Sequence, residues 1–190
     1  DLPCMDDDMM RRGKASTWAE YGEDIGVLTG DALMMFAFET AANAFETSID
    51  PDELSRIGRA MGILAHKTGV YGMIGGQTVD VELAGGPIPG DKLDFIYRLK
   101  TGALIEASML IGAVLGGAAE EDCKIVESLA SKIGMAFQIQ DDILDVTGSQ
   151  DVTGKPSGSD EKNKKTTYVT LEGLEKAKKD VEQISTEAIE

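Results

Sequence analysis

Long apolar segments with a helical repeat run through most of the chain, and they limit the available folds more than any other feature. Between residues 23 and 45, for example, apolar side chains recur near the spacing of one helix face: Ile25, Leu28, Leu33, Phe36 and Ala37. Aromatic residues make up only 5% of the sequence, and alternating runs of β-branched residues are absent. We therefore predict an all-α fold in which long apolar helices pack as a bundle.

Local signals mark where several helices begin and end. Asp50 suits an N-cap, Pro51 suits the first helical position, and Glu53 completes a capping pattern. We expect helices at about 23–45, 51–67, 91–115 and 120–146 and a last one from Tyr168, with continued helix at 68–83 and loops at 84–91 and 147–165. Because no linker or change of composition separates these segments, residues 1–190 are predicted to form a single domain.

The composition argues against several classes of function. The formal net charge of −16 argues against binding nucleic acid through a broad basic face. His66 is the only histidine, so Ser-His-Asp catalysis and sites with several histidine ligands are not expected. Cys4 and Cys123 form no disulfide framework, which favours a reducing cytoplasm. The longest apolar stretch, at 108–119, is too short to span a bilayer, so no stable membrane insertion is expected.

An acidic cluster interrupts an otherwise apolar helix at 134–148, "GMAFQIQDDILDVTG". Asp141 and Asp145 are four residues apart and share a helix face, and Gln138 lies on the same stripe. Two carboxylates this close repel each other unless a cation lies between them, and rigidly held oxygen ligands suit Mg²⁺. The alternative is a solvent-exposed acidic face near a helix end, and the pattern alone leaves both interpretations open.

The first 14 residues, "DLPCMDDDMMRRGK", form a second charged cluster. Asp1 and Asp6 precede the adjacent Arg11 and Arg12. Carboxylates suit a metal and guanidinium groups suit an anion, so the two together suit a metal–phosphate complex. The alternative is a charged terminus whose residues pair with one another.

Cationic residues follow the second acidic cluster: Lys155, Lys162, Lys164 and Lys165. In so acidic a chain this local reversal of charge suits phosphate binding, although a solubilising surface loop is an equal alternative. Lys100 and Thr101 lie inside an apolar helix, where a lysine is unfavourable unless it is paired, lines a cavity or extends to solvent. In "GGQTVD" (75–80), Gln77 and Asp80 are expected to have at most a supporting role.

Together these motifs resemble those of the trans-prenyltransferases, the family of farnesyl and geranylgeranyl diphosphate synthases. The second aspartate-rich motif of that family, DDxxD, appears as Asp141-Asp142-Ile143-Leu144-Asp145 in "FQIQDDILD", and the first appears in "DLPCMD…RRGK". "GEDIGVLTGDAL", "GMIGGQTVD", "RLKTGAL" and "GKPSGSDEKNKKTTYV" also look like family blocks in family order. The resemblance covers essentially the whole chain and implies the isoprenoid-synthase helical bundle around a central cavity.

The resemblance also implies an activity, which is the condensation of isopentenyl diphosphate with dimethylallyl, geranyl or farnesyl diphosphate, releasing pyrophosphate. Three Mg²⁺ ions, for which Mn²⁺ can substitute, would assist ionisation, and the matching ligands are Asp1, Asp6, Asp141, Asp142 and Asp145. Residues that bind the allylic diphosphate are matched by Arg11, Lys100, Lys155 and Lys165, and Arg12 matches one that holds isopentenyl diphosphate. Thr101 and Gln138 resemble oxygen donors that face the allylic cation.

Parts of the family pattern are missing from the chain. The first aspartate of the first motif would precede Asp1, and a Gly-Gly-Lys-Arg type motif and the residues that set product length would lie further upstream. We therefore expect a fragment without N-terminal helices and part of the C-terminus, inactive alone. The alternatives are a non-catalytic subunit of a heteromeric prenyltransferase and a terpene cyclase on the same fold. Because the family usually dimerises, a cytoplasmic homodimer is expected.

Overall fold

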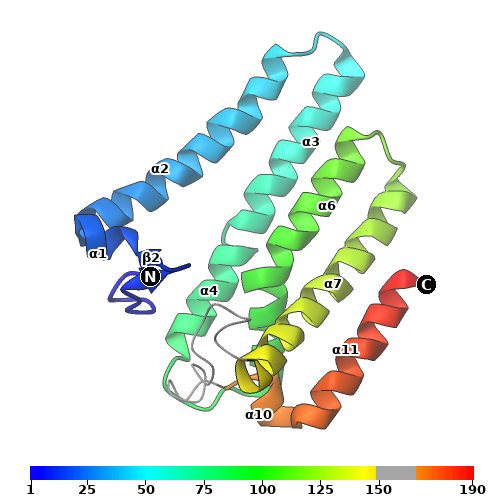
Figure 1. Cartoon of the computed structure of the whole chain (residues 1–190). Helices are drawn as coiled ribbons and strands as arrows, with labels where there is room; N and C mark the ends of the chain where they lie inside the picture. The colour runs from blue at the N-terminus through cyan, green and yellow to red at the C-terminus, as the bar shows by residue number, and fades with distance from the viewer. Residues whose placement is uncertain (149–165) are drawn as a thin grey trace. The chain divides into compact units, whose positions relative to one another are not determined.

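The computed structural model of the protein describes residues 1–148 and 166–190. The predictions for Lys155 and Lys165 lie outside these described residues. Contacts group the chain into two compact units, Asp1–Leu54 and Ser55–Glu190, and each unit is described by itself. Helices form nearly all of the regular structure in both units (Figure 1), which confirms the all-α prediction. The single domain expected from the sequence stays a prediction.

The N-terminal unit begins with turns and a short hairpin. Strands β1 (Met10–Arg11) and β2 (Lys14–Ala15) pair antiparallel, with Met10 opposite Ala15. Arg12 and Gly13 connect them, and both have positive φ angles, 53° and 77°, as a tight two-residue hairpin requires. The sequence predicts no strands here, because strands of two residues are too short to show an alternating pattern.

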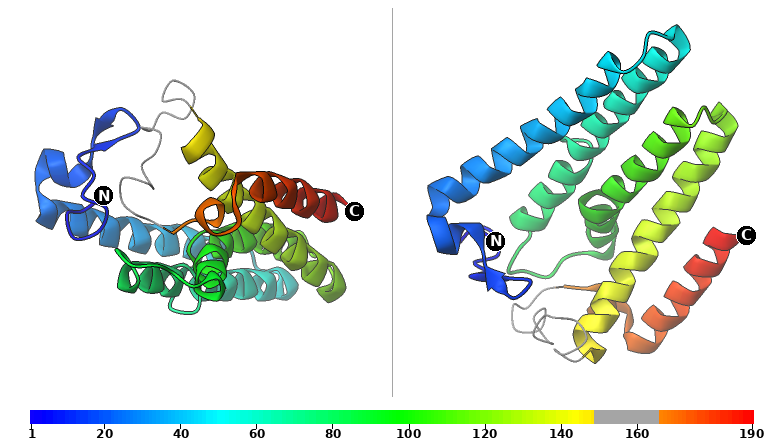
Figure 2. Two further views of the ribbon diagram at one scale, coloured as in Figure 1. Left: turned by 90° about the horizontal axis from the view of Figure 1, so that it is seen from below. Right: turned by 45° about the horizontal axis from the view of Figure 1, so that its top comes forward.

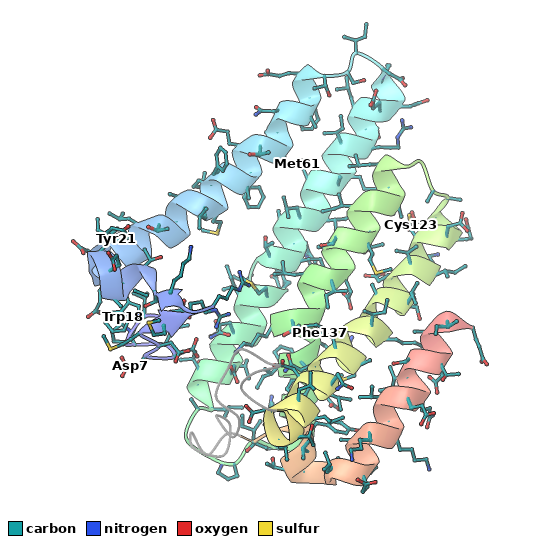
Figure 3. The ribbon with its side chains drawn as sticks, viewed as in Figure 1. Asp7, Trp18, Tyr21, Met61, Cys123 and Phe137 are labelled. Carbon is teal, nitrogen blue, oxygen red and sulfur yellow. The ribbon has the colours of Figure 1, made fainter. Side chains whose placement is uncertain are left out.

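Two helices complete this unit. They are α1 (Thr17–Tyr21) and α2 (Glu23–Ala42), which continues into the 3₁₀ turn η1 (Asn43–Glu46) and confirms the helix expected at 23–45. The indole N–H of Trp18 donates to the carbonyl oxygen of Asp8 at 3.0 Å, which ties α1 to the N-terminal turns (Figure 3).

Helix α2 carries apolar side chains around its whole circumference, and the N-terminal unit buries none of its residues. Among the described residues, Glu23–Glu46 is the one helix long and apolar enough to cross a membrane. This finding corrects the expectation that no stretch is long enough, because a spanning helix tolerates isolated polar residues such as Thr29 and Asp31. Core helices of soluble proteins pass the same test, so the finding indicates only that α2 needs an apolar cover.

The second unit begins within α3 (Pro51–Thr68), whose first residues belong to the N-terminal unit. As expected, Asp50 caps this helix, because its Oδ1 accepts a hydrogen bond from the N–H of Asp52 at 3.1 Å. A turn separates α3 from α4 (Met73–Glu82), where continuous helix was expected. A Cβ atom on Gly72 would lie 1.9 Å from the carbonyl oxygen of Lys67, so only glycine fits at this turn.

Among the remaining helices, α7 lies between α6 and α11 (Figures 1 and 2). In chain order they are α5 (Gly90–Ile96), the π-helical segment η2 (Tyr97–Gly102), α6 (Ala103–Leu115), α7 (Glu120–Thr147), α10 (Tyr168–Glu172) and α11 (Leu174–Ile189). The helices expected at 91–115 and 120–146 are confirmed. The π-helical segment and the break at Gly173, where φ is 86°, were not foreseen.

One face of α7 is apolar and packs against α11, which fixes the orientation of the helix. Ile139 is fully buried and Ile143 is 5% exposed, and both pack against α11 around Ala177. Since Asp141 and Asp145 lie on the other side of the same turns, the packing leaves their carboxylates outside this apolar cluster.

Candidate active site

The π-helical segment η2 interrupts a long helix at Lys100 and Thr101. Two glycines allow neighbouring helices to approach its backbone closely. A Cβ atom on Gly76 of α4 would lie 2.4 Å from the backbone nitrogen of Lys100, and one on Gly134 of α7 would lie 2.8 Å from the Cα of Gly102. Short π-helical turns occur often at functional sites, and here η2 is enclosed by α4 on one side and α7 on the other.

Lys100 is ion-paired rather than free. Its Nζ donates to Oδ2 of Asp80 on α4 at 2.6 Å, and the two side chains are 32% and 14% exposed. This pair explains how a lysine is accommodated inside an apolar helix. Asp80 therefore contacts a candidate site residue, and this contact agrees with the supporting role expected of it.

Thr101 joins η2 to α7 through a hydrogen bond. Its hydroxyl donates to Oε1 of Gln138 at 2.8 Å, and both side chains are half-buried. Phe137, labelled in Figure 3, marks this part of α7. The structure thus joins Thr101, which follows Lys100 directly, to Gln138, which lies 37 residues further along the chain.

The three aspartates of the acidic motif lie in different environments on α7. Asp141 is exposed, Asp145 is half-buried, and Asp142 is only 4% exposed. Oδ2 of Asp142 accepts hydrogen bonds from the hydroxyl of Tyr97 at 2.5 Å and from the N–H of Tyr168 at 2.8 Å. A solvated acidic face, the alternative considered for this motif, does not account for the burial of Asp142.

Tyr168 connects this region to α11. Its hydroxyl donates to Oδ2 of Asp180 at 2.7 Å. Burial and this hydrogen bond to a carboxylate raise the pKa of Tyr168 to about 12. The same hydrogen bond lowers the pKa of Asp180 below its ordinary value.

The N-terminal cluster of Asp1, Asp6, Arg11 and Arg12 lies in the other unit. Its one described link between an arginine and an aspartate side chain is loose, with Nη1 of Arg11 lying 3.7 Å from Oδ1 of Asp1. Within residues 1–148 and 166–190, no three acidic, histidine or cysteine side chains converge in a metal-binding arrangement. The metal and diphosphate roles expected for this cluster stay predictions, as do the metal roles of Asp141, Asp142 and Asp145.

A second charged cluster in the C-terminal unit was missed by the sequence analysis. Nζ of Lys67 lies 2.5 Å from Oε2 of Glu106 and 3.0 Å from Oε1 of Glu127. Burial alone would lower the pKa of Lys67, but its hydrogen bonds to the two carboxylates raise the pKa above its ordinary value. Glu106 within an apolar helix was a usable signal, because a buried carboxylate needs a partner. This cluster lines a surface hollow that includes none of the candidate site residues.

Solved structures share this fold and identify its class. The chain matches a Helicobacter pylori geranyltransferase, crystallised with magnesium and isoprenyl diphosphate, with a TM-score of 0.86 and 35% identity over 99% of the chain and 60% of that protein. The fold is therefore that of the all-helical isoprenyl diphosphate synthases. The chain belongs to the polyprenyl synthetase family, whose family model matches residues 1–190.

Curated relatives agree with this assignment. The large subunit 1 of the heterodimeric chloroplastic geranylgeranyl pyrophosphate synthase of Arabidopsis thaliana is 44% identical over 99% of the chain and 51% of its own length. The farnesyl diphosphate synthase of Escherichia coli (strain K12) is 40% identical over 99% of the chain and 62% of its own length. The chain thus spans about half to three-fifths of the length of the relatives it matches.

Proposed function

We propose that the protein is a prenyl diphosphate synthase, which condenses isopentenyl diphosphate with dimethylallyl, geranyl or farnesyl diphosphate and releases pyrophosphate. The observation that carries this proposal is the contact between η2 and α7. It sets the hydroxyl of Thr101, the residue after Lys100, beside the helix that bears Asp141 and Asp145.

The chemistry requires two different environments next to each other. Breaking the allylic C–O bond leaves negative charge on the departing diphosphate and a delocalised cation on carbon. The ammonium group of Lys100 stabilises the diphosphate, and the oxygen atoms of Thr101 and Gln138 present dipoles to the cation. The double bond of isopentenyl diphosphate then attacks the allylic carbon, and a proton is lost. Because His66 is the only histidine, we propose that pyrophosphate accepts this proton.

We propose Mg²⁺ as the metal because of the chemistry of the donors. Asp141 and Asp145 offer hard carboxylate oxygens, and Asp1 and Asp6 offer the same donors in the N-terminal unit. When bound, Mg²⁺ supplies Lewis-acid stabilisation of the leaving diphosphate. The Helicobacter pylori relative, described as a complex with magnesium and isoprenyl diphosphate, supports this ligand class. We also propose that Arg11, Arg12, Lys155 and Lys165 bind diphosphate groups.

A homodimer is proposed as the assembled state. Helix α2 exposes large apolar side chains on more than one side, among them Leu28, Leu33, Met35 and Phe36. The apolar surface of such a helix must be buried against protein or lipid, and a second copy of the chain would bury it against protein. Sedimentation of the full-length protein with and without liposomes tests this. A monomeric protein would contradict the homodimer, and so would sedimentation of all the protein together with the liposomes.

A cytoplasmic location is proposed because the cysteines carry free thiols, buried in Cys123 and exposed in Cys4. Imaging of the tagged full-length protein tests this location, and a signal confined to an organelle would contradict it.

The activity is tested with the full-length protein, Mg²⁺, isopentenyl diphosphate and each of the three allylic diphosphates. We expect a chain-extended product and one pyrophosphate per condensation. Pyrophosphate release from the allylic substrate alone would indicate a cyclase. Condensation that appears only after a second subunit is added would indicate the heteromeric alternative. No product under any of these conditions would rule the proposal out.

A further inference from the structure

Three residues from three segments form a buried hydrogen-bonded cluster, whose contacts indicate another role for Asp142 than the metal binding expected from the sequence. They are Tyr97 at the start of η2, Asp142 on α7 and Tyr168 at the start of α10, and we call them the Tyr97 cluster. Tyr97 is 5% exposed and Asp142 is 4% exposed. Besides the two bonds to Asp142, the N–H of Tyr168 lies 3.2 Å from the hydroxyl oxygen of Tyr97, so the three groups contact one another.

The Tyr97 cluster is one of several links between η2 and α7. Four residues beyond Tyr97, the hydroxyl of Thr101 donates to Gln138, which lies four residues before Asp142. The two segments run antiparallel, so these bonds act as two cross-links with Lys100 between them. Beyond the second cross-link, Gly102 and Gly134 bring the two backbones into direct contact.

The ring and the hydroxyl of Tyr97 contribute differently to the position of η2. The ring of Tyr97 packs with Leu93 and Ile96, which orient the end of α5. Apolar packing is not directional, and it does not by itself determine how η2 is rotated against α7. A hydrogen bond to a buried carboxylate is directional and strong, because the charge is shielded from water.

We infer that Tyr97 is a positioning residue which, through Asp142, fixes η2 against α7 and so determines where Lys100 and Thr101 lie relative to Asp141 and Asp145. This inference rests on the proposed function for its effect on catalysis. It also separates two aspartates of the motif: Asp142 anchors the cluster, whereas Asp141 is exposed and is proposed to bind a metal.

The first experiment compares Tyr97→Phe with the matched control Tyr71→Phe in the full-length protein. Tyr97→Phe keeps the packed ring and removes only the hydroxyl, whereas Tyr71 is 73% exposed and its ring stacks on His66. We expect kcat of Tyr97→Phe to fall about tenfold or more while KM for isopentenyl diphosphate changes less than about twofold. Tyr71→Phe should leave both constants within about twofold of the wild-type values. A kcat of Tyr97→Phe equal to that of the control would overturn the inference.

A second pair of variants distinguishes positioning from metal binding. Asp142→Asn keeps an oxygen acceptor for Tyr97 and Tyr168 but removes the charge, and Asp141→Asn makes the same change at an exposed position. We expect the Mg²⁺ concentration at half-maximal rate to rise about tenfold or more in Asp141→Asn and to change less than about twofold in Asp142→Asn. An equal rise in both variants would assign Asp142 to the metal and overturn the inference.

Hydrogen exchange supplies a measurement that does not depend on activity. In Tyr97→Phe we expect amides of residues 97–102 to exchange about tenfold or more faster than in the wild-type protein, with no change in Tyr71→Phe. Unchanged exchange at 97–102 in Tyr97→Phe would contradict the inference even in an active enzyme. If the wild-type protein condenses no substrate, the proposed function fails, and the exchange result still decides whether Tyr97 fixes η2.

Discussion

Nζ of Lys100 lies 2.6 Å from Oδ2 of Asp80, so the lysine proposed to bind a diphosphate is oriented by a carboxylate from another helix. Replacing Asp80 with Asn removes this charge and leaves Lys100 less constrained. A hydrogen bond between charged groups contributes about 1.5–3 kcal/mol, so we expect kcat/KM for the allylic diphosphate to fall about tenfold or more in Asp80→Asn. Steady-state kinetics checks this, with exposed Asp94→Asn as the control. An unchanged value in Asp80→Asn would contradict the positioning of Lys100 by this pair.

Asp141 is exposed to solvent. We therefore expect Asp141→Ala to change the free energy of unfolding by less than about 0.5 kcal/mol. The rate of condensation should fall about a hundredfold or more, because a proposed metal ligand is lost. Urea unfolding and product formation are measured on the same preparation, with Asp94→Ala as the control. A stable variant that retains the wild-type rate would remove Asp141 from the site.

Gly76 permits the close approach of α4 to η2. An added Cβ would lie 2.4 Å from the backbone nitrogen of Lys100 and 2.7 Å from Cβ of Leu99, so the helices must separate. We expect Gly76→Ala to lower the free energy of unfolding by about 2 kcal/mol, as overpacking commonly does. The matched control is Gly112→Ala in α6, where a Cβ would meet nothing within 4 Å and should stabilise the protein by about 0.5 kcal/mol. Equal effects of the two substitutions in urea unfolding would show that α4 and η2 are not closely packed.

Lys67 neutralises a buried carboxylate. Its side chain is 18% exposed and that of Glu106 is 11% exposed, so Lys67→Met leaves Glu106 buried without its partner. We expect a loss of about 3 kcal/mol in the free energy of unfolding. The double variant Lys67→Met/Glu106→Gln should recover part of this loss, and exposed Lys92→Met should have little effect. A double variant no more stable than Lys67→Met alone would contradict this account.

Tyr168 makes stability depend on pH in alkaline solution. Its pKa is about 12 in the folded protein and about 10 in the unfolded chain, because burial and Asp180 disfavour the phenolate. A pKa raised on folding stabilises the protein below the unfolded value, so this contribution is fully present below about pH 10 and is lost between about pH 10 and 12. After solvent screening we expect it to be about 1 kcal/mol. Between about pH 10 and 12, the free energy of unfolding should depend less on pH in Tyr168→Phe than in the wild-type protein. Identical pH profiles of the two proteins would contradict the prediction.

The acidic motif shows what residue spacing predicts and what it does not. The spacing of Asp141 and Asp145 predicts that they share a helix face, and the structure agrees because α7 is a regular helix. The environment of Asp142 depends on Tyr97, which lies 45 residues earlier, and on the backbone of Tyr168. No local pattern records such partners, since they meet only when η2 and α10 pack against α7.

The same limit explains the Lys67 cluster and the π-helical segment. Lys67 and Glu106 are 39 residues apart, so the apolar surroundings of Glu106 indicate that it needs a partner but not that the partner is Lys67. The extra residue in the π-helical turn leaves the apolar pattern of 91–115 nearly unchanged, so the sequence predicts a regular helix there.

By itself the sequence determined that the chain is all-α, where most helices begin and end, and that acidic and cationic motifs suited to diphosphate chemistry occur in it. These features depend on residue spacing and capping, which act over a few residues. Tertiary structure alone decided that Asp80 holds Lys100, that Thr101 meets Gln138 and that Asp142 is buried by Tyr97 and Tyr168. Those contacts require close packing between helices distant in sequence, which Gly76 and Gly134 permit because they lack a side chain.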